Sequence, residues 1–183
     1  DWRDVWMQRL KGEPFLPIKW LEHQNRDWYW KHGSICENFG SIKAATLAVG
    51  GWGDAYKNAV PTLVENLKSP VKGIIGPWAH KYPHFASPEP RIGFLEEATR
   101  WWDQWLKNID RGVVNDPVYT AYLMDGVRPK TWYEERKGKW IIENNWPHNV
   151  LKEEWCFGDD ENLFMHNGSE KNICVKVSSP QDC

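Results

Sequence analysis

Two short apolar runs, each closed by a Gly/Trp turn and followed by one ionisable residue, constrain this chain most. Ala44–Val49 runs into a Gly-rich turn with Asp54 behind it, and Val71–Ile75 runs into a second turn with His80 behind it. Apolar runs without polar alternation are typical of strands buried on both faces, as in parallel sheets. Because parallel strands end at one edge of a sheet, the pattern predicts an acid and a base at that edge.

The segments around these runs favour an α/β layer. Ala55–Leu67 places its apolar side chains on one helical face, and Pro61 is expected to delay the start of that helix. A strand, a crossover helix and a second strand form a βαβ unit, so the two strands are predicted to be parallel. Phe94–Leu106 carries the clearest amphipathic pattern and is expected to cover the sheet beside the second strand.

Composition excludes several classes of protein. Of the 183 residues 41% are hydrophobic, which is enough for a core, and the formal net charge of −2 argues against a nucleic-acid surface. No apolar run approaches the roughly 18 residues of a membrane span, so no membrane partner is expected. Because it opens at Asp1 without Met, the chain is expected to be a cut or processed piece.

Cysteine and tryptophan usage gives weaker information. Cys36, Cys156, Cys174 and Cys183 show no CxxC spacing, which favours free thiols, with a Cys174–Cys183 bridge left open. The 14 Trp residues suit either core packing or an aromatic substrate platform. Packing is favoured because several Trp residues fall on helical stripes or in the two turns.

Both ends of the chain differ from this α/β layer. Trp2–Leu10 has helical spacing that Pro14 ends, short helices are expected over Leu16–His32, and Ser34 has the spacing of a capping box with Glu37. Beyond a linker, short runs between turns predict antiparallel β structure, in Val118–Met124, Thr131–Tyr133, Trp140–Ile142, Leu151–Phe157 and Ile173–Val177. That stretch is interpreted as the start of a sandwich.

Asp54 and His80 suit acid–base chemistry. A histidine is a general base near neutral pH, and a carboxylate on its far nitrogen fixes the tautomer and stabilises the imidazolium. Asp before His is also the order found in α/β-hydrolase triads. Taken by spacing alone, the pattern favours a helix cap or turn residue for Asp54 and a structural role for His80.

The residues around this pair resemble the CocE/NonD family of serine hydrolases, which includes cocaine esterase, X-Pro dipeptidyl-peptidases and α-amino acid ester hydrolases. The resemblance is carried by Gly50–Tyr56 (GGWGDAY) and Gly76–His80 (GPWAH), continues in Trp101–Lys107 (WWDQWLK), and covers about residues 1–125. It implies a partial α/β-hydrolase sheet with cap helices, followed by the first strands of a jelly-roll-like β-sandwich.

The resemblance also implies roles for individual residues. Asp54 would be the triad acid and His80 the triad base, with Trp52 and Tyr56 as candidate substrate-binding residues. The implied substrate is a small acyl ester or a peptide, with neither a metal nor another cofactor, and a homo-oligomer is left open. Gly53 stands where several members of the family have Tyr, which removes one aromatic wall of the pocket.

One triad member is not found. Only Ser34 and Ser41 precede Asp54, and neither follows a strand or has Gly two residues before it, as a nucleophile elbow requires. The chain is therefore interpreted as a fragment that lacks the Ser nucleophile, with the N-terminal half of the hydrolase domain as its partner. Its expected parts are a cap or connection (1–43), the C-terminal part of the hydrolase domain (44–112) and the start of a β-rich domain (113–183).

Three alternatives to the hydrolase stay open. One is a structural piece that only complements its missing half, and another is a non-catalytic, Trp-rich binding module. The third is a metal site formed by Asp54, His80 and His84, which Pro83 disfavours because it breaks the helical spacing of the two histidines.

Overall fold

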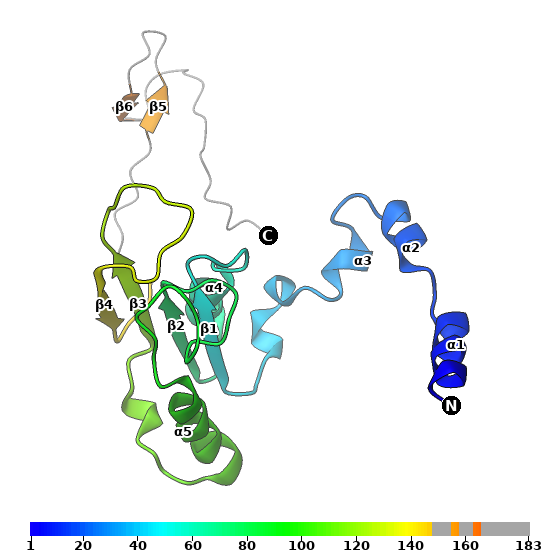
Figure 1. Ribbon diagram of the computed structural model, residues 1–183, viewed down its shortest axis with the longest axis horizontal. Coiled ribbons are helices and arrows are strands. Elements are labelled where there is room, and N and C mark those ends of the chain that lie inside the picture. The colour runs from blue at the N-terminus through cyan, green and yellow to red at the C-terminus, as the bar shows by residue number, and fades with distance from the viewer. Residues whose placement is uncertain (148–154, 158–162, 166–183) are drawn as a thin grey trace. The chain divides into compact units, whose positions relative to one another are not determined.

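The computed structural model describes residues 1–147, 155–157 and 163–165, and their contacts divide the chain into two compact units (Figure 1). The first unit is Asp1–Ser41 and the second begins at Ile42. Within the described residues no helix is both long and apolar enough to cross a membrane.

The first unit is a series of short helices. Its elements are α1 (Trp2–Gly12), α2 (Leu16–Glu22), α3 (Trp28–Lys31) and two 3₁₀ turns, η1 (Ile35–Glu37) and η2 (Phe39–Ser41). The Asp1 carboxylate accepts a hydrogen bond from the Arg3 N–H at 3.3 Å and so caps α1, which ends just before Pro14. The predicted first helix and the short helices after it are confirmed.

The capping box predicted at Ser34 is wrong. Ser34 does precede η1, and its carbonyl accepts from the Glu37 N–H at 3.2 Å, but its side chain makes no cap. The Ser34 hydroxyl lies 2.9 Å from the Cys36 thiol, and the Glu37 carboxylate pairs with Arg26. The guanidinium therefore takes the carboxylate that a capping box would need.

The second unit is organised by a mixed four-stranded sheet. Its strands are β1 (Thr46–Gly51), β2 (Val71–Gly76), β3 (Tyr119–Met124) and β4 (Gly138–Glu143), in the order β1-β2-β3-β4. β1 pairs in parallel with β2, and β2 with β3, whereas β3 and β4 are antiparallel. The parallel βαβ unit predicted from the two apolar runs is confirmed.

Helix α4 (Ala59–Asn66) packs on one face of this sheet. Residues 55–58 form a turn, so Pro61 falls in the first turn of the helix, where its missing N–H costs nothing. Val60 and Val64 lie in a core cluster with Ile75 of β2 and Tyr119 of β3. The helix thus begins at Ala59, after the start of the predicted segment at Ala55, as expected from Pro61.

Helix α5 (Phe94–Lys107) is present where its amphipathic pattern predicts it, and it contacts β2 through an ion pair. Successive strand residues point to opposite faces, so Lys72 projects away from the α4 side, where Gly73 meets Val64. The buried Lys72 ammonium donates to Glu97 of α5 at 2.9 Å and to Asp116 at 2.6 Å. Asp116 follows a 3₁₀ turn, η3 (Val113–Asn115).

The C-terminal expectations are corrected in part. The strands predicted at Val118–Met124 and Trp140–Ile142 are β3 and β4, and they pair antiparallel as expected. The parallel pairing of β3 with β2, which extends the same sheet, was not expected. Residues 131–133 form a bend and coil instead of the predicted strand. β5 (Trp155–Phe157) and β6 (Leu163–Met165) form an antiparallel pair. The rest of 151–157, the strand over 173–177 and the Cys174–Cys183 bridge lie outside the described residues, and the jelly-roll domain stays a prediction.

Candidate active site

Backbone hydrogen bonds join the two turns that follow β1 and β2. The strands are in register to their last residues, with Gly51 opposite Gly76. Beyond the strands, the Trp52 N–H donates to the Gly76 carbonyl and the Gly53 N–H donates to the Trp78 carbonyl, each at 2.9 Å. The parallel pairing therefore continues past the sheet and brings the segments after both strands together.

Close approach of these turns requires glycine at position 51. A Cβ atom there would lie 2.1 Å from the carbonyl oxygen of Trp78 and 2.7 Å from its carbonyl carbon. Both contacts are with backbone atoms, which cannot rotate away as a side chain can. Gly51 thus permits the close approach of the two turns, one of which carries Asp54 and the other His80.

Asp54 and His80 are in direct contact at this edge of the sheet. Asp54 Oδ2 lies 2.6 Å from His80 Nδ1, and Asp54 Oδ1 accepts the Tyr56 N–H at 2.9 Å. The Tyr56 N–H and then His80 stabilise the carboxylate and lower the Asp54 pKa. The Asp54 side chain is 14% exposed and that of His80 83% exposed. With Nδ1 donating to Asp54, Nε2 of His80 is left to exchange protons.

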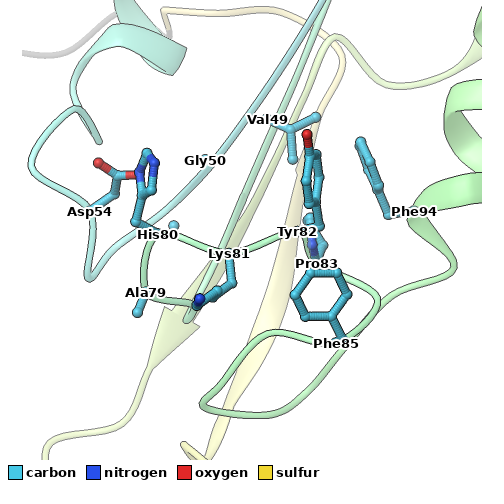
Figure 2. A pocket seen from close by; sticks show the side chains of 11 residues that line it. Val49, Gly50, Asp54, Ala79, His80, Lys81, Tyr82, Pro83, Phe85 and Phe94 are labelled. Atoms are coloured by element: carbon cyan, nitrogen blue, oxygen red, sulfur yellow. The ribbon is translucent and has the colours of Figure 1, made fainter. Parts of the chain in front are cut away.

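A cavity of about 550 Å³ opens beside this pair (Figure 2). Its lining combines the end of β1, both residues of the pair and an aromatic wall: Val49, Gly50, Gly51, Asp54, Ala79, His80, Lys81, Tyr82, Pro83, Phe85 and Phe94. A largely apolar cavity with a few convergent polar groups is typical of a small-molecule site.

The two residues expected to bind substrate, Trp52 and Tyr56, do not line this cavity. The Trp52 indole N–H donates to the Tyr122 carbonyl at 2.7 Å and its ring packs on the core. Tyr56 is 75% exposed. Their role in substrate binding stays a prediction, whereas packing by Trp52 accords with the expected structural use of Trp.

Sequence reasoning missed the aromatic wall. Tyr82, Phe85 and Phe94 line the cavity, but two of them lie in a Pro-rich loop without any periodic pattern. The sequence indicates them only by the concentration of aromatic residues shortly after His80. The loop is held by hydrogen bonds from the Phe85 N–H to the Tyr82 carbonyl at 3.1 Å and from the Ala79 N–H to the Ser87 carbonyl at 2.9 Å.

A second His–Asp pair, in the first unit, differs in its surroundings. His23 Nδ1 lies 2.6 Å from Asp27 Oδ2, and the Asp27 side chain also caps α3 through the Tyr29 N–H at 3.0 Å. The His23 side chain is 11% exposed, with the Tyr29 ring stacked on it at 4.6 Å. His23 lowers the Asp27 pKa, and the pair holds α3 in place.

Neither serine of the first unit has the setting of a nucleophile. The Ser41 hydroxyl donates to the Asn38 carbonyl at 2.8 Å, and Ser34 contacts Cys36. Across the part of the chain that the structure describes, no group of three or more His, Cys, Asp or Glu side chains is arranged to hold a metal ion.

Known proteins resemble the chain in sequence over one part and in fold over most of it. The sequence profile of the X-Pro dipeptidyl-peptidase family (S15 family) matches residues 1–82, which include both Asp54 and His80. No curated protein matches the chain.

The fold is similar to the crystal structure of a CocE/NonD family hydrolase from Staphylococcus aureus, with a TM-score of 0.59 and 16% sequence identity. The similarity covers 88% of this chain but only 28% of that one. The profile and the fold together support the resemblance to CocE/NonD-type hydrolases, and they do not favour the Trp-rich binding module.

Proposed function

We propose that this chain is the C-terminal part of the catalytic domain of a CocE/NonD-type serine hydrolase. Asp54 is its triad acid and His80 its triad base. The observation that carries the proposal is the 2.6 Å contact between these side chains at the carboxyl ends of two parallel strands. The S15 profile, which spans both residues, supports it.

The proposed reaction is acyl transfer in two steps. A serine hydroxyl from a segment before Asp1 attacks the carbonyl of an ester or amide while His80 Nε2 takes its proton. The tetrahedral intermediate then expels the alcohol or amine, which receives that proton from His80, and an acyl-serine remains. Water attacks the acyl-serine with His80 again as the base, and release of the acid restores the serine.

Asp54 acts on His80 rather than on the substrate. Its carboxylate accepts the Nδ1 proton, so that Nε2 is the basic nitrogen, and it stabilises the imidazolium formed in each step. The Tyr56 N–H keeps this carboxylate ionised by lowering its pKa and fixes its orientation.

A fluorophosphonate probe tests the proposal, because it forms a covalent adduct only with an activated serine. The longest natural protein that contains this chain is treated with the probe, and the adduct is located by peptide mass spectrometry. We expect one labelled serine before Asp1, and no label in the His80→Ala variant. The matched control is His32→Ala, which removes an exposed histidine of the first unit and is expected to label normally.

Two results would contradict the proposal. One is the absence of any labelled serine in the folded protein. The other is a label that persists at full intensity in His80→Ala, since the serine would then be activated without His80.

A further inference from the structure

The cavity beside His80 has an exposed aromatic wall. The rings of Tyr82 and Phe94 stack with centroids 5.9 Å apart, and Phe85 meets Tyr82 edge-on at 6.0 Å. Tyr82 is 63% exposed and Phe85 51% exposed. Such rings normally bury most of their area, so a cluster that stays open toward a cavity is suited to contact with a ligand.

This wall is built as a firm surface. Behind the exposed rings, His84 stacks on Phe94 with an interplanar angle of 5° and meets Phe85 edge-on at 4.6 Å. Pro83 and Ala86 of the same loop are buried. The exposed rings therefore rest on packed neighbours and keep their positions relative to His80.

The wall lies on one definite side of the Asp54–His80 pair. In Figure 2 His80 stands between Asp54 and the rings of Tyr82, Phe85 and Phe94. All of these side chains line one cavity. A ligand that fills this cavity can therefore contact the rings at one end and the imidazole at the other.

We propose that Tyr82, Phe85 and Phe94 form the leaving-group subsite, and that the substrates are esters or amides with an apolar, preferably aromatic, leaving group. The argument rests on the proposed function. With Nδ1 bound to Asp54, Nε2 is the nitrogen that protonates the departing alcohol or amine, so this group must lie next to the imidazole. The aromatic wall lines the same cavity as the imidazole, and a cavity of about 550 Å³ accommodates a ring.

This assignment has a kinetic signature. Esters that share one acyl group form the same acyl-serine, so they differ only in the step that releases the alcohol. A preference for aromatic leaving groups must therefore appear in kcat/KM for acylation and vanish from the rate of deacylation.

Two ester pairs test it in the longest natural protein that contains this chain. Benzyl acetate and ethyl acetate share the acyl group and differ in the alcohol, whereas ethyl phenylacetate and ethyl acetate share the alcohol. We expect benzyl acetate to have the higher kcat/KM. In Phe85→Ala and Tyr82→Ala the ratio for benzyl over ethyl acetate should fall about tenfold, the scale of a lost hydrophobic pocket contact. The kcat/KM for ethyl acetate should change little, and so should the ratio of kcat/KM for ethyl phenylacetate over ethyl acetate.

Matched variants separate the ring from other effects. Tyr82→Phe keeps the ring and should keep the wild-type ratio, and Phe85→Leu keeps apolar volume without the ring and should lower it in part. Trp102→Ala removes an exposed ring of α5 that does not line the cavity and should leave both ratios unchanged. Fluorophosphonate labelling shows that each variant retains a folded site. Where an Ala variant does not label, the benzyl-over-ethyl ratio of Phe85→Leu tests the assignment instead.

The outcomes separate this inference from the proposed function. The leaving-group assignment is overturned if the Ala variants lose kcat/KM equally for benzyl and ethyl acetate, or if they lose it only for ethyl phenylacetate. In either case a labelled serine leaves the proposed function intact. The absence of both labelling and ester hydrolysis overturns the proposed function, and the subsite with it.

Discussion

At the scale of single residues, the two oxygens of Asp54 have separate partners. One accepts the Tyr56 N–H in the turn and the other contacts His80. Asp54 is thus a turn residue that also contacts His80, whereas the helix cap that the sequence allowed is not found, because Asn58 precedes α4. Sequence spacing was enough to predict the contact with His80, because parallel strands fix where the following residues lie.

Asp54→Asn tests the catalytic role without removing the turn. The amide oxygen can still accept the Tyr56 N–H, so the fold should persist, but the amide no longer stabilises the imidazolium or selects its tautomer. We expect kcat of the complete protein to fall about 10⁴-fold, as for such a change in other triads. Steady-state kinetics measures the loss, and circular dichroism checks the fold. Full activity in this variant would rule out the triad role.

Asp103 predicts a pH dependence of stability. Its side chain is 6% exposed and accepts from Lys107 at 2.8 Å and from Arg111 at 3.0 and 2.8 Å, and these cations lower its pKa, Lys107 most. A carboxyl whose folded pKa lies below its unfolded value of about 3.9 stabilises the fold above that pH and loses this effect as pH falls through the folded pKa.

We therefore expect Asp103→Asn to lower the melting temperature by several degrees at neutral pH, with a difference from wild type that shrinks below about pH 4. Thermal unfolding at a series of pH values measures it. A difference that stays constant down to pH 2 would show that the charge of Asp103 is not responsible.

At the scale of elements, Gly51 allows the turns after β1 and β2 to approach closely enough for Asp54 to contact His80. Gly51→Ala puts a Cβ against the Trp78 backbone, so the turn that carries His80 must shift. We expect a loss of about 1–3 kcal/mol in the free energy of unfolding, as for other overpacked sites, and a fall in turnover larger than that loss explains. Urea unfolding and kcat measure the two effects.

The control for this change is Gly126→Ala, since a Cβ at Gly126 meets no atom within 4 Å. This variant should match the wild type in both measurements. Unchanged turnover in a stable Gly51→Ala variant would mean that the spacing of the turns does not control the Asp54–His80 contact.

The elements also show where sequence patterns stop being informative. β1, α4, β2 and α5 were predictable because their apolar spacing reflects two-sided or one-sided burial. The pairing of β3 was not, because this strand is parallel to β2 on one side and antiparallel to β4 on the other, and alternation along a strand does not encode the direction of its neighbours. The aromatic wall was missed for a related reason, since loop residues have no period.

At the scale of the whole molecule, the Asp54–His80 pair belongs to a chain that matches only part of a known hydrolase. The chain spans 28% of the structure that it resembles. We expect the isolated 183-residue chain to show no esterase or peptidase turnover, because a His–Asp pair without an activated serine and its oxyanion hole forms no acyl-enzyme. Assays with chromogenic esters and X-Pro amides measure this. Turnover by the pure chain that disappears in His80→Ala would overturn the expectation.

The loop after His80 is built independently of the Asp54–His80 pair. The Asp54–His80 pair depends on strand register and on main-chain hydrogen bonds between two turns, whereas the aromatic wall depends on side chains of one short surface loop and the start of α5. Exchanging these rings leaves the main-chain bonds untouched. Under the proposed function, selection or a library built on residues 81–85 can therefore change which substrates are preferred without changing the Asp54–His80 pair.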